Sequence, residues 1–133
     1  MQIIIFTLND KYYAINTEEV EEITKTISLT RVPNAEGWTE GLINLRGNVI
    51  TLVNLSKLLL QSEDSCYNNI IIVNIEEEKI GILVKEVMEV VNIEDDNIEN
   101  FSNENKGIAG IYRIDNRIIN IVDIHSLLYK NEG

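Results

Sequence analysis

Apolar residues along this chain gather in short runs rich in Ile, Val, Leu and Tyr, and polar turn-forming residues separate the runs. Runs of this length and composition are typical of β-strands. They predict strands at residues 3–8, 11–15, 41–46, 48–55, 69–75, 79–84, 108–114 and 117–124. Because the intervals leave little room for crossover helices, the pattern indicates an all-β protein built from antiparallel strands.

The chain also repeats itself. Residues 41–59 align without a gap with residues 110–128 at an offset of 69, so that Gly41 meets Gly110 and Val53 meets Val122. Upstream, residues 6–23 match residues 73–90 in pattern at an offset of 67. The same order of elements in both halves indicates an internal duplication rather than chance similarity between β-rich segments.

Helices are predicted to be few and short. One is expected to begin at Asn16, with Glu19 as its capping-box partner and with Val20 and Ile23 on one face; Val87 and Val90 have the same spacing of three. Further short helices are expected where Ser56 caps the segment "KLLLQ" and at "HSLLYK" near the end of the chain.

The segments between these elements are predicted to be irregular. Thr30–Val32, just before the only proline, is expected to be extended. Residues 61–69 are interpreted as a linker and residues 94–107 as an acidic, mobile loop.

The length of 133 residues fits one domain. Each half is too small to hold a large core alone, so we expect two small barrels that pack on each other across an apolar seam. The predicted division places the first sub-barrel mainly at residues 11–65. The second is placed mainly at residues 68–129, together with the N-terminal strand.

Charge and hydropathy narrow the classes of partner. The net charge of −11 argues against nucleic acid and anionic membranes, because binding to phosphate relies on clusters of Lys and Arg. No run of about 18 apolar residues is present, and the N-terminus lacks the features of a signal peptide. We therefore expect a cytoplasmic protein whose partners are other proteins.

No catalytic constellation stands out, and an enzyme is not expected. Cys66 is the only cysteine and His125 the only histidine, which excludes an internal disulfide and a structural zinc site. No phosphate-binding glycine loop occurs. The carboxylates cluster in runs, as in 76–78, that are typical of solvated turns rather than of acid–base pairs. No metal or cofactor is predicted.

Three segments carry a family resemblance. "FTLNDKYYAINTEEVEEI", "GLINLRGNVITLVNLSKLL" and "IVDIHSLL" resemble the CheW family of bacterial chemotaxis coupling proteins, from Phe6 to Leu128. The most specific element is G-x-I-N-L-R-G at 41–47. The resemblance implies two intertwined, SH3-like, five-stranded β-barrels with short helices.

The resemblance also implies a non-enzymatic adaptor that couples membrane chemoreceptors (methyl-accepting chemotaxis proteins) to the CheA histidine kinase. Such an adaptor is cytoplasmic and is recruited to membrane receptor arrays. The regulatory domain of that kinase has the same fold, so a kinase fragment is an alternative; the position of Met1 and the end just after the last helix favour a free-standing adaptor.

The resemblance implies a receptor-binding groove and a paired arginine beside it. The residues implied for receptor binding are Ile4, Val20, Glu22, Ile23, Arg46 and Val87, with Arg46 holding the carboxylate of Glu22. The alternative is that the aliphatic members are core residues and that Arg46 is an exposed turn residue. The repeat equivalent of Arg46 is Asp115, so the duplicated fold itself does not require the arginine.

The kinase contact is predicted on the first-half hairpin, at Gly47, Val49 and Leu52. The chain departs from the family pattern at Thr51, where proline is common, at Asn54, where aspartate is common, and at Thr17, where the groove is often aliphatic. Two alternatives remain open. One is an adaptor of a chemosensory pathway that does not control swimming, and the other is a β-barrel domain that senses a small molecule.

Overall fold

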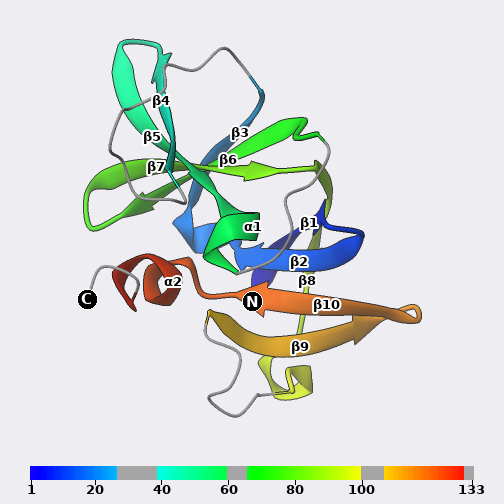
Figure 1. The fold of residues 1–133 in the computed structure, drawn as a ribbon. Coiled ribbons are helices and arrows are strands. Elements are labelled where there is room, and N and C mark those ends of the chain that lie inside the picture. Colours follow the sequence, from blue (N-terminus) through cyan, green and yellow to red (C-terminus); the bar gives the residue numbers. More distant parts are fainter. Residues whose placement is uncertain (27–38, 60–65, 100–106, 131–133) are drawn as a thin grey trace.

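The fold consists of two five-stranded sheets that pack against each other (Figure 1). The computed structural model describes residues 1–26, 39–59, 66–99 and 107–130. In spatial order, sheet A contains β8 (Glu86–Asn92), β1 (Gln2–Leu8), β2 (Lys11–Asn16), β10 (Arg117–Val122) and β9 (Ile108–Ile114). Sheet B contains β3 (Val20–Lys25), β6 (Asn69–Ile75), β7 (Glu78–Val84), β5 (Asn48–Asn54) and β4 (Thr39–Leu45). The predicted all-β class with two five-stranded units is confirmed.

Two short helices complete the described fold, α1 (Leu55–Leu58) and α2 (Ile124–Lys130), with single 3-10 turns at η1 (Thr17–Glu19) and η2 (Asp95–Asn97). All eight predicted strands are present, with bounds that shift by at most two residues. The helix predicted at "HSLLYK" is also present. The extended piece predicted at 30–32 lies outside the described residues, as do 61–65 of the linker and 100–106 of the acidic loop.

The internal repeat is visible in the topology. Replacing each strand of sheet A by its repeat equivalent (β8 by β3, β1 by β6, β2 by β7, β10 by β5, β9 by β4) reproduces the strand order of sheet B. Each sheet therefore combines the first hairpin of one half with three strands of the other half. The junctions are the two parallel pairings, β2 with β10 and β5 with β7.

This exchange differs from the predicted sub-barrel division of 11–65 and 68–129. Strand β2 belongs to sheet A with the last two strands, whereas β6 and β7 belong to sheet B. Sequence order suggested that neighbouring segments share a barrel, as sequential elements often do. The parallel pairings override this tendency because they join each first hairpin to strands of the other half.

Four hairpins share one kind of turn. The central residues Asn9–Asp10, Arg46–Gly47, Glu76–Glu77 and Asp115–Asn116 all have positive φ, between 47° and 85°. Positive φ at both central residues is the mark of the two-residue type I′ turn, whose twist matches that of the strands. The turns correspond in pairs at the repeat offsets, so the duplication extends to backbone conformation.

The helix predicted from Asn16 is wrong beyond its first turn. After η1 the chain continues as strand β3, and the equivalent segment with Val87 is strand β8. In both strands a β-bulge shifts the register, between Val20 and Glu22 in β3 and opposite Ile5–Phe6 in β8. The inserted residue brings positions three apart onto one face of the strand, which imitates helical spacing.

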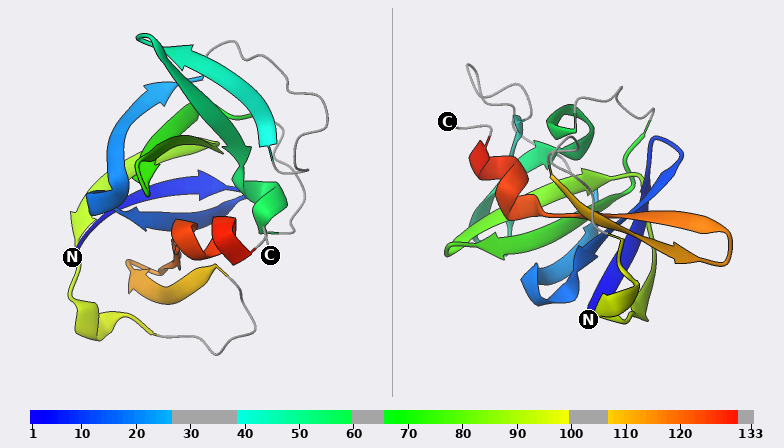
Figure 2. Two further views of the ribbon diagram at one scale, coloured as in Figure 1. Left: turned by 90° about the vertical axis from the view of Figure 1, so that its left-hand side faces the viewer. Right: turned by 90° about the horizontal axis from the view of Figure 1, so that it is seen from below.

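Apolar side chains form three clusters. One lies on the inner side of sheet A and includes Ile3, Ile5 and Ile119, and another lies on the inner side of sheet B and includes Ile43, Leu52 and Ile72. The largest cluster fills the seam between the sheets, where Phe6 and Tyr13 meet Ile71 and Val84, and residues of α1 and α2 cover it. Figure 2 shows both helices beside this seam. The predicted apolar seam is therefore present.

Helix α1 is capped by Asn54 and not by Ser56 as predicted. The Asn54 side chain accepts a hydrogen bond from the backbone N–H of Lys57 at 3.3 Å, as an N-cap residue does. Ser56 is buried instead, and its hydroxyl contacts the Asn9 side chain at 3.4 Å. In the second half, Asp123 accepts equivalent bonds from the Ser126 N–H and hydroxyl, at 3.1 and 2.8 Å.

Candidate partner-binding surface

The two bulged strands carry apolar side chains to the surface. Val20 and Ile23 of β3 lie opposite Val73 and Ile71 of β6, which belong to the seam cluster. Their repeat equivalents Val87 and Val90 of β8 lie opposite Phe6 and Ile4. Ile23 and Val90 are 38% and 50% exposed, whereas Val20 and Val87 are partly buried against the seam cluster. We call these four residues the edge-strand surface.

The two edge strands lie on the same side of the molecule, since both follow a crossing from one sheet to the other (Figure 2, left). The predicted receptor-binding residues Val20, Ile23 and Val87 are thus brought onto equivalent positions of one side. Ile4 is only 4% exposed and supports this surface from below, next to Val90. As such it offers a partner little direct contact.

The predicted pairing of Arg46 with Glu22 is present. The Arg46 guanidinium donates to the Glu22 carboxylate, and 68% of the arginine side chain is exposed. Arg46 lies in the β4–β5 turn and Glu22 on β3, which are at opposite edges of sheet B. The pair therefore joins the two edges of that sheet beside the edge-strand surface.

A second ion pair joins β8, one edge of sheet A, to β10, the strand next to the opposite edge. Arg117 at the start of β10 donates to Glu89 of β8 at 3.1 Å, and Glu89 is the repeat equivalent of Glu22. This arginine is 25% exposed because its guanidinium lies over the ring of Tyr12, 5.3 Å from the ring centre. The hydrogen bond to Glu89 is the main cause that raises the pKa of Arg117.

The two hairpin tips nevertheless differ. Arg46 occupies the turn of β4–β5, whereas its repeat equivalent in the turn of β9–β10 is the exposed Asp115, and Arg117 follows that turn. An arginine of the last hairpin that pairs with a glutamate of the opposite edge strand is therefore common to both sheets. Presenting the arginine at the very tip is particular to the first half.

The residues predicted for kinase binding separate into two groups. Gly47 and Val49 lie at the exposed tip of the β4–β5 hairpin, where Val49 is 64% exposed. Gly47 adopts a φ of +85°, and its N–H is held by the Asn44 side chain at 3.1 Å. Leu52 is fully buried among the core residues of sheet B, so its side chain is not part of this exposed surface.

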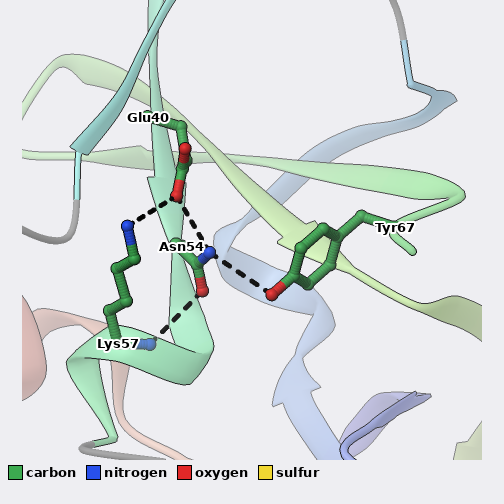
Figure 3. A network of polar contacts seen from close by, with 4 residues as sticks. All are labelled: Glu40, Asn54, Lys57 and Tyr67. Atoms are coloured by element: carbon green, nitrogen blue, oxygen red, sulfur yellow. Dashed lines mark hydrogen bonds and ion pairs between the residues drawn. The ribbon is translucent and has the colours of Figure 1, made fainter. Parts of the chain in front are cut away.

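A buried polar network anchors the other end of this hairpin (Figure 3). The Asn54 amide donates to Glu40 at 3.0 Å and to the Tyr67 hydroxyl at 3.3 Å, and Lys57 lies 3.2 Å from the same Glu40 carboxylate. Asn54 is completely buried. An aspartate there would face Glu40 without an amide to donate, which gives a physical reason for asparagine at this departure from the family pattern.

The sole histidine and cysteine do not form a reactive pair. His125, half exposed, lies 3.1 Å from Glu76, and Cys66 is exposed on a different segment. Within the described residues, no group of three or more His, Cys, Asp or Glu side chains is arranged to hold a metal ion. In those same ranges, no helix has the length and hydropathy of a membrane span.

One carboxyl group near α2 has a shifted pKa. Burial raises the pKa of Glu19 above its ordinary value, the charges of Asp123 and Glu18 raise it further, and His125 opposes them. On β3, by contrast, a hydrogen bond from Asn74 lowers the pKa of the exposed Glu21. Glu21 also pairs with Lys79 at 3.3 Å, so the groups around it are those of a surface ion pair.

Comparison with known proteins identifies the family. The model of the CheW-like domain matches residues 2–132. The chain belongs to the CheW-like family. The CheW-like chain is 32% identical over 139 residues to the chemotaxis protein CheW of Bacillus subtilis, covering 99% of this chain and 89% of the relative.

Structural comparison agrees with this assignment. The scaffolding protein TtCheW from Thermoanaerobacter tengcongensis superposes with a TM-score of 0.88 at 31% identity, over 95% of this chain and 86% of the other. The sensor histidine kinase CheAY of Helicobacter pylori is 27% identical over 134 residues, which span 96% of this chain but 16% of the kinase. A CheW-like unit is therefore also part of a kinase.

Sequence reasoning missed three residues of this region. Val90 is the exposed counterpart of Ile23, and Glu89 with Arg117 is the counterpart of Glu22 with Arg46. The repeat offset of 67, which relates position 23 to 90 and position 22 to 89, could have indicated Val90 and Glu89. Arg117 has no such signal, because its repeat equivalent is Asn48 and only the fold brings it to Glu89.

Proposed function

We propose that this CheW-like protein is a non-enzymatic adaptor in chemotaxis signal transduction, which couples chemoreceptors to a CheA-type histidine kinase. The observation that carries the proposal is the match of the whole chain to CheW proteins in sequence and in structure. The protein acts in the cytoplasm and is recruited to receptor arrays by its partners.

The receptor contact lies on the edge-strand surface. Ile23 and Val90 offer exposed aliphatic side chains. Val20 and Val87 lie between these and the seam, against which they are partly buried, and the buried Ile4 supports the surface from below. Aliphatic side chains in such an arrangement suit the apolar face of a helix from the receptor tip. Arg46 is held by Glu22 beside this surface, with part of its guanidinium free to bind a carboxylate of the receptor.

The kinase contact lies on the tip of the β4–β5 hairpin. Val49 is the most exposed of the large apolar residues in the described chain, and Gly47 within the turn has open space where a side chain would be. Leu52 supports the hairpin from within the core. A kinase regulatory domain is a fitting partner, since a kinase relative carries a CheW-like unit of its own.

The proposal is tested by co-sedimentation of the protein with receptor signalling fragments and the kinase, for the wild type beside Arg46→Glu. We expect the wild type to join the complex. The variant should be lost from it, because its carboxylate repels Glu22 and removes the exposed guanidinium. The matched control is Arg113→Glu, which breaks another exposed arginine pair, that of Arg113 on β9 with Glu99 at 3.4 Å.

Three outcomes are informative. Loss of binding by Arg46→Glu alone, with an unchanged circular dichroism spectrum, supports both the adaptor role and the position of the receptor contact. Equal loss by both variants points to general electrostatics and contradicts the assigned site. A wild type that binds neither receptor nor kinase contradicts the adaptor function.

A further inference from the structure

The edge-strand surface has an internal two-fold character. Val20 corresponds to Val87 and Ile23 to Val90 at the repeat offset of 67. Val20 and Ile23 flank the bulge of β3, as Val87 and Val90 flank that of β8. The strands that support them, β6 and β1, are also repeat equivalents. A rotation that exchanges the two halves of the molecule therefore places this surface on itself.

Such a surface cannot by itself fix the direction of a partner. A pair of antiparallel helices has its own approximate two-fold axis, so apolar contacts alone permit two opposite orientations of nearly equal energy. Selection between them requires a difference in free energy, which must come from residues that break the symmetry.

The strongest asymmetry lies in the charges of the two hairpin tips. The turn of β4–β5 presents the exposed guanidinium of Arg46, whereas the equivalent position of the turn of β9–β10 presents the exposed carboxylate of Asp115. The two arginines of the second half lie outside the turn: Arg117 is folded onto Tyr12 and held by Glu89, and Arg113 pairs with Glu99. At equivalent turn positions, one tip thus exposes a guanidinium that Glu22 partly neutralises, and the other exposes a carboxylate.

We propose that this charge reversal between Arg46 and Asp115 sets the direction in which a helical hairpin lies across the edge-strand surface. The inference rests on the proposed adaptor function. A partner with an acidic residue toward one end and a basic residue toward the other gains attraction at both tips in one orientation. It meets like charges at both tips in the reverse orientation, and juxtaposed like charges are a strong determinant of specificity.

The test reads the orientation directly. Nitroxide labels are attached at Lys25→Cys or at Asn92→Cys, in a Cys66→Ser background; these two exposed positions are repeat equivalents at the ends of β3 and β8. Each labelled protein is mixed with an isotope-labelled receptor signalling hairpin, and the loss of NMR signal along the hairpin is recorded. In the otherwise wild-type protein, the two labels should bleach opposite ends of the hairpin.

The decisive variant carries Arg46→Asp with Asp115→Arg, which exchanges the tip charges and keeps the net charge. Unlike Arg46→Glu alone, this variant retains one arginine at a hairpin tip, so we expect it to bind with the bleached ends exchanged between the two labels. In the neutral variant Arg46→Gln with Asp115→Asn, each label should bleach both ends to a similar extent. Circular dichroism and thermal unfolding verify that both variants remain folded.

The possible failures are distinguishable. If the variants bind with the bleached ends as in the wild type, the charge reversal does not set the direction and this inference alone is overturned. The inference alone is likewise overturned if the wild type binds the hairpin and the charge-exchanged variant, still folded, does not. If the wild-type protein does not bind the hairpin at all, the proposed function is overturned and the inference with it.

Discussion

At the scale of single residues, repeat equivalents show how one methyl group changes the packing of a sheet on its core. Gly81 of β7 corresponds to Ala14 of β2, and both are fully or almost fully buried. A Cβ atom at Gly81 would lie 2.9 Å from Ile70 Cγ2 and 3.1 Å from Leu52 Cδ1. Sheet B therefore closes more tightly on its core at this point than sheet A does.

This close approach predicts that Gly81→Ala destabilises the protein, by about 1–3 kcal/mol, because the added methyl group overpacks the core. Urea unfolding followed by circular dichroism measures the change. The matched substitution Ala14→Gly should also destabilise, since it removes a packed methyl group and adds backbone freedom. A Gly81→Ala protein more stable than the wild type would contradict the packing argument.

A second residue-scale prediction concerns pH. The pKa of Glu19 is raised in the folded state, first by burial and then by Asp123, so folding favours the protonated form. This contribution is fully present below the unfolded pKa of about 4.5 and is lost as pH rises through the higher folded pKa. Glu19→Gln should therefore be more stable than the wild type at pH 7, by about 0.3 kcal/mol because the site is partly solvated.

The measurement is urea unfolding of both proteins between pH 4 and pH 8. The advantage of Glu19→Gln should shrink as the pH falls through the raised pKa and the wild-type carboxyl group becomes neutral. The control is Glu18→Gln, an exposed neighbour on the same 3-10 turn. A gap that widens toward acid would mean that the charged carboxylate is favoured by folding.

At the scale of elements, the four hairpin turns hold residues other than glycine in the left-handed region of backbone conformation. Glu77 holds a φ of 68° in the β6–β7 turn, and Asn116 holds a φ of 67° at the same position of the β9–β10 turn. Asparagine adopts this left-handed conformation more readily than most residues. Glutamate adopts it at a higher energy, because its Cβ atom lies close to the backbone without a compensating local hydrogen bond. The sequence of the β6–β7 turn is thus less suited to the type I′ conformation than that of the β9–β10 turn.

Replacing Glu77 by glycine should relieve this strain and stabilise the protein by about 0.5–1 kcal/mol. Thermal unfolding monitored by circular dichroism gives the change in Tm. Asn116→Gly is the matched control and should have a smaller effect, because asparagine already accepts the left-handed conformation. Equal effects at both turns would show that chain entropy, rather than strain at Glu77, dominates.

At the scale of the whole molecule, the exchange of first hairpins couples the two sheets. Sheet A cannot form without β1 and β2 of the first half and β8 to β10 of the second, and sheet B has the converse requirement. The seam cluster adds a shared core of residues such as Phe6 and Ile71. The molecule should therefore unfold as one cooperative unit, although it contains two sheets.

Native-state hydrogen exchange tests this coupling. Backbone amides in the central strands β2 and β7 should exchange with the same free energy of opening, equal to the global free energy of unfolding. Phe6→Ala, which leaves a cavity in the seam, should lower both by about 3–5 kcal/mol. Separate opening of one sheet, or a two-step urea transition, would contradict the coupling.

Much of this architecture follows from the sequence alone. The eight apolar runs determined their strands because each is bounded by residues that turn the chain, and the repeat offsets of 67 and 69 determined which elements correspond. The partnership of Arg46 with Glu22 came from the family resemblance, and the ion pair is present. The adaptor class followed from the same resemblance, and membership of the CheW-like family is confirmed.

Other features were decided only by tertiary structure. Val20 and Ile23 have helical spacing, yet they lie on a strand because a bulge, stabilised by pairing with β6, restores them to one face. The assignment of hairpins to sheets depends on the parallel pairings β2–β10 and β5–β7, which join segments remote in sequence. Arg117 and the burial of Leu52 depend on the same long-range contacts. Local sequence patterns determine the hairpins, in which a strand pairs with the next one along the chain. The pairing of strands remote in sequence is determined by the packing that buries the apolar seam.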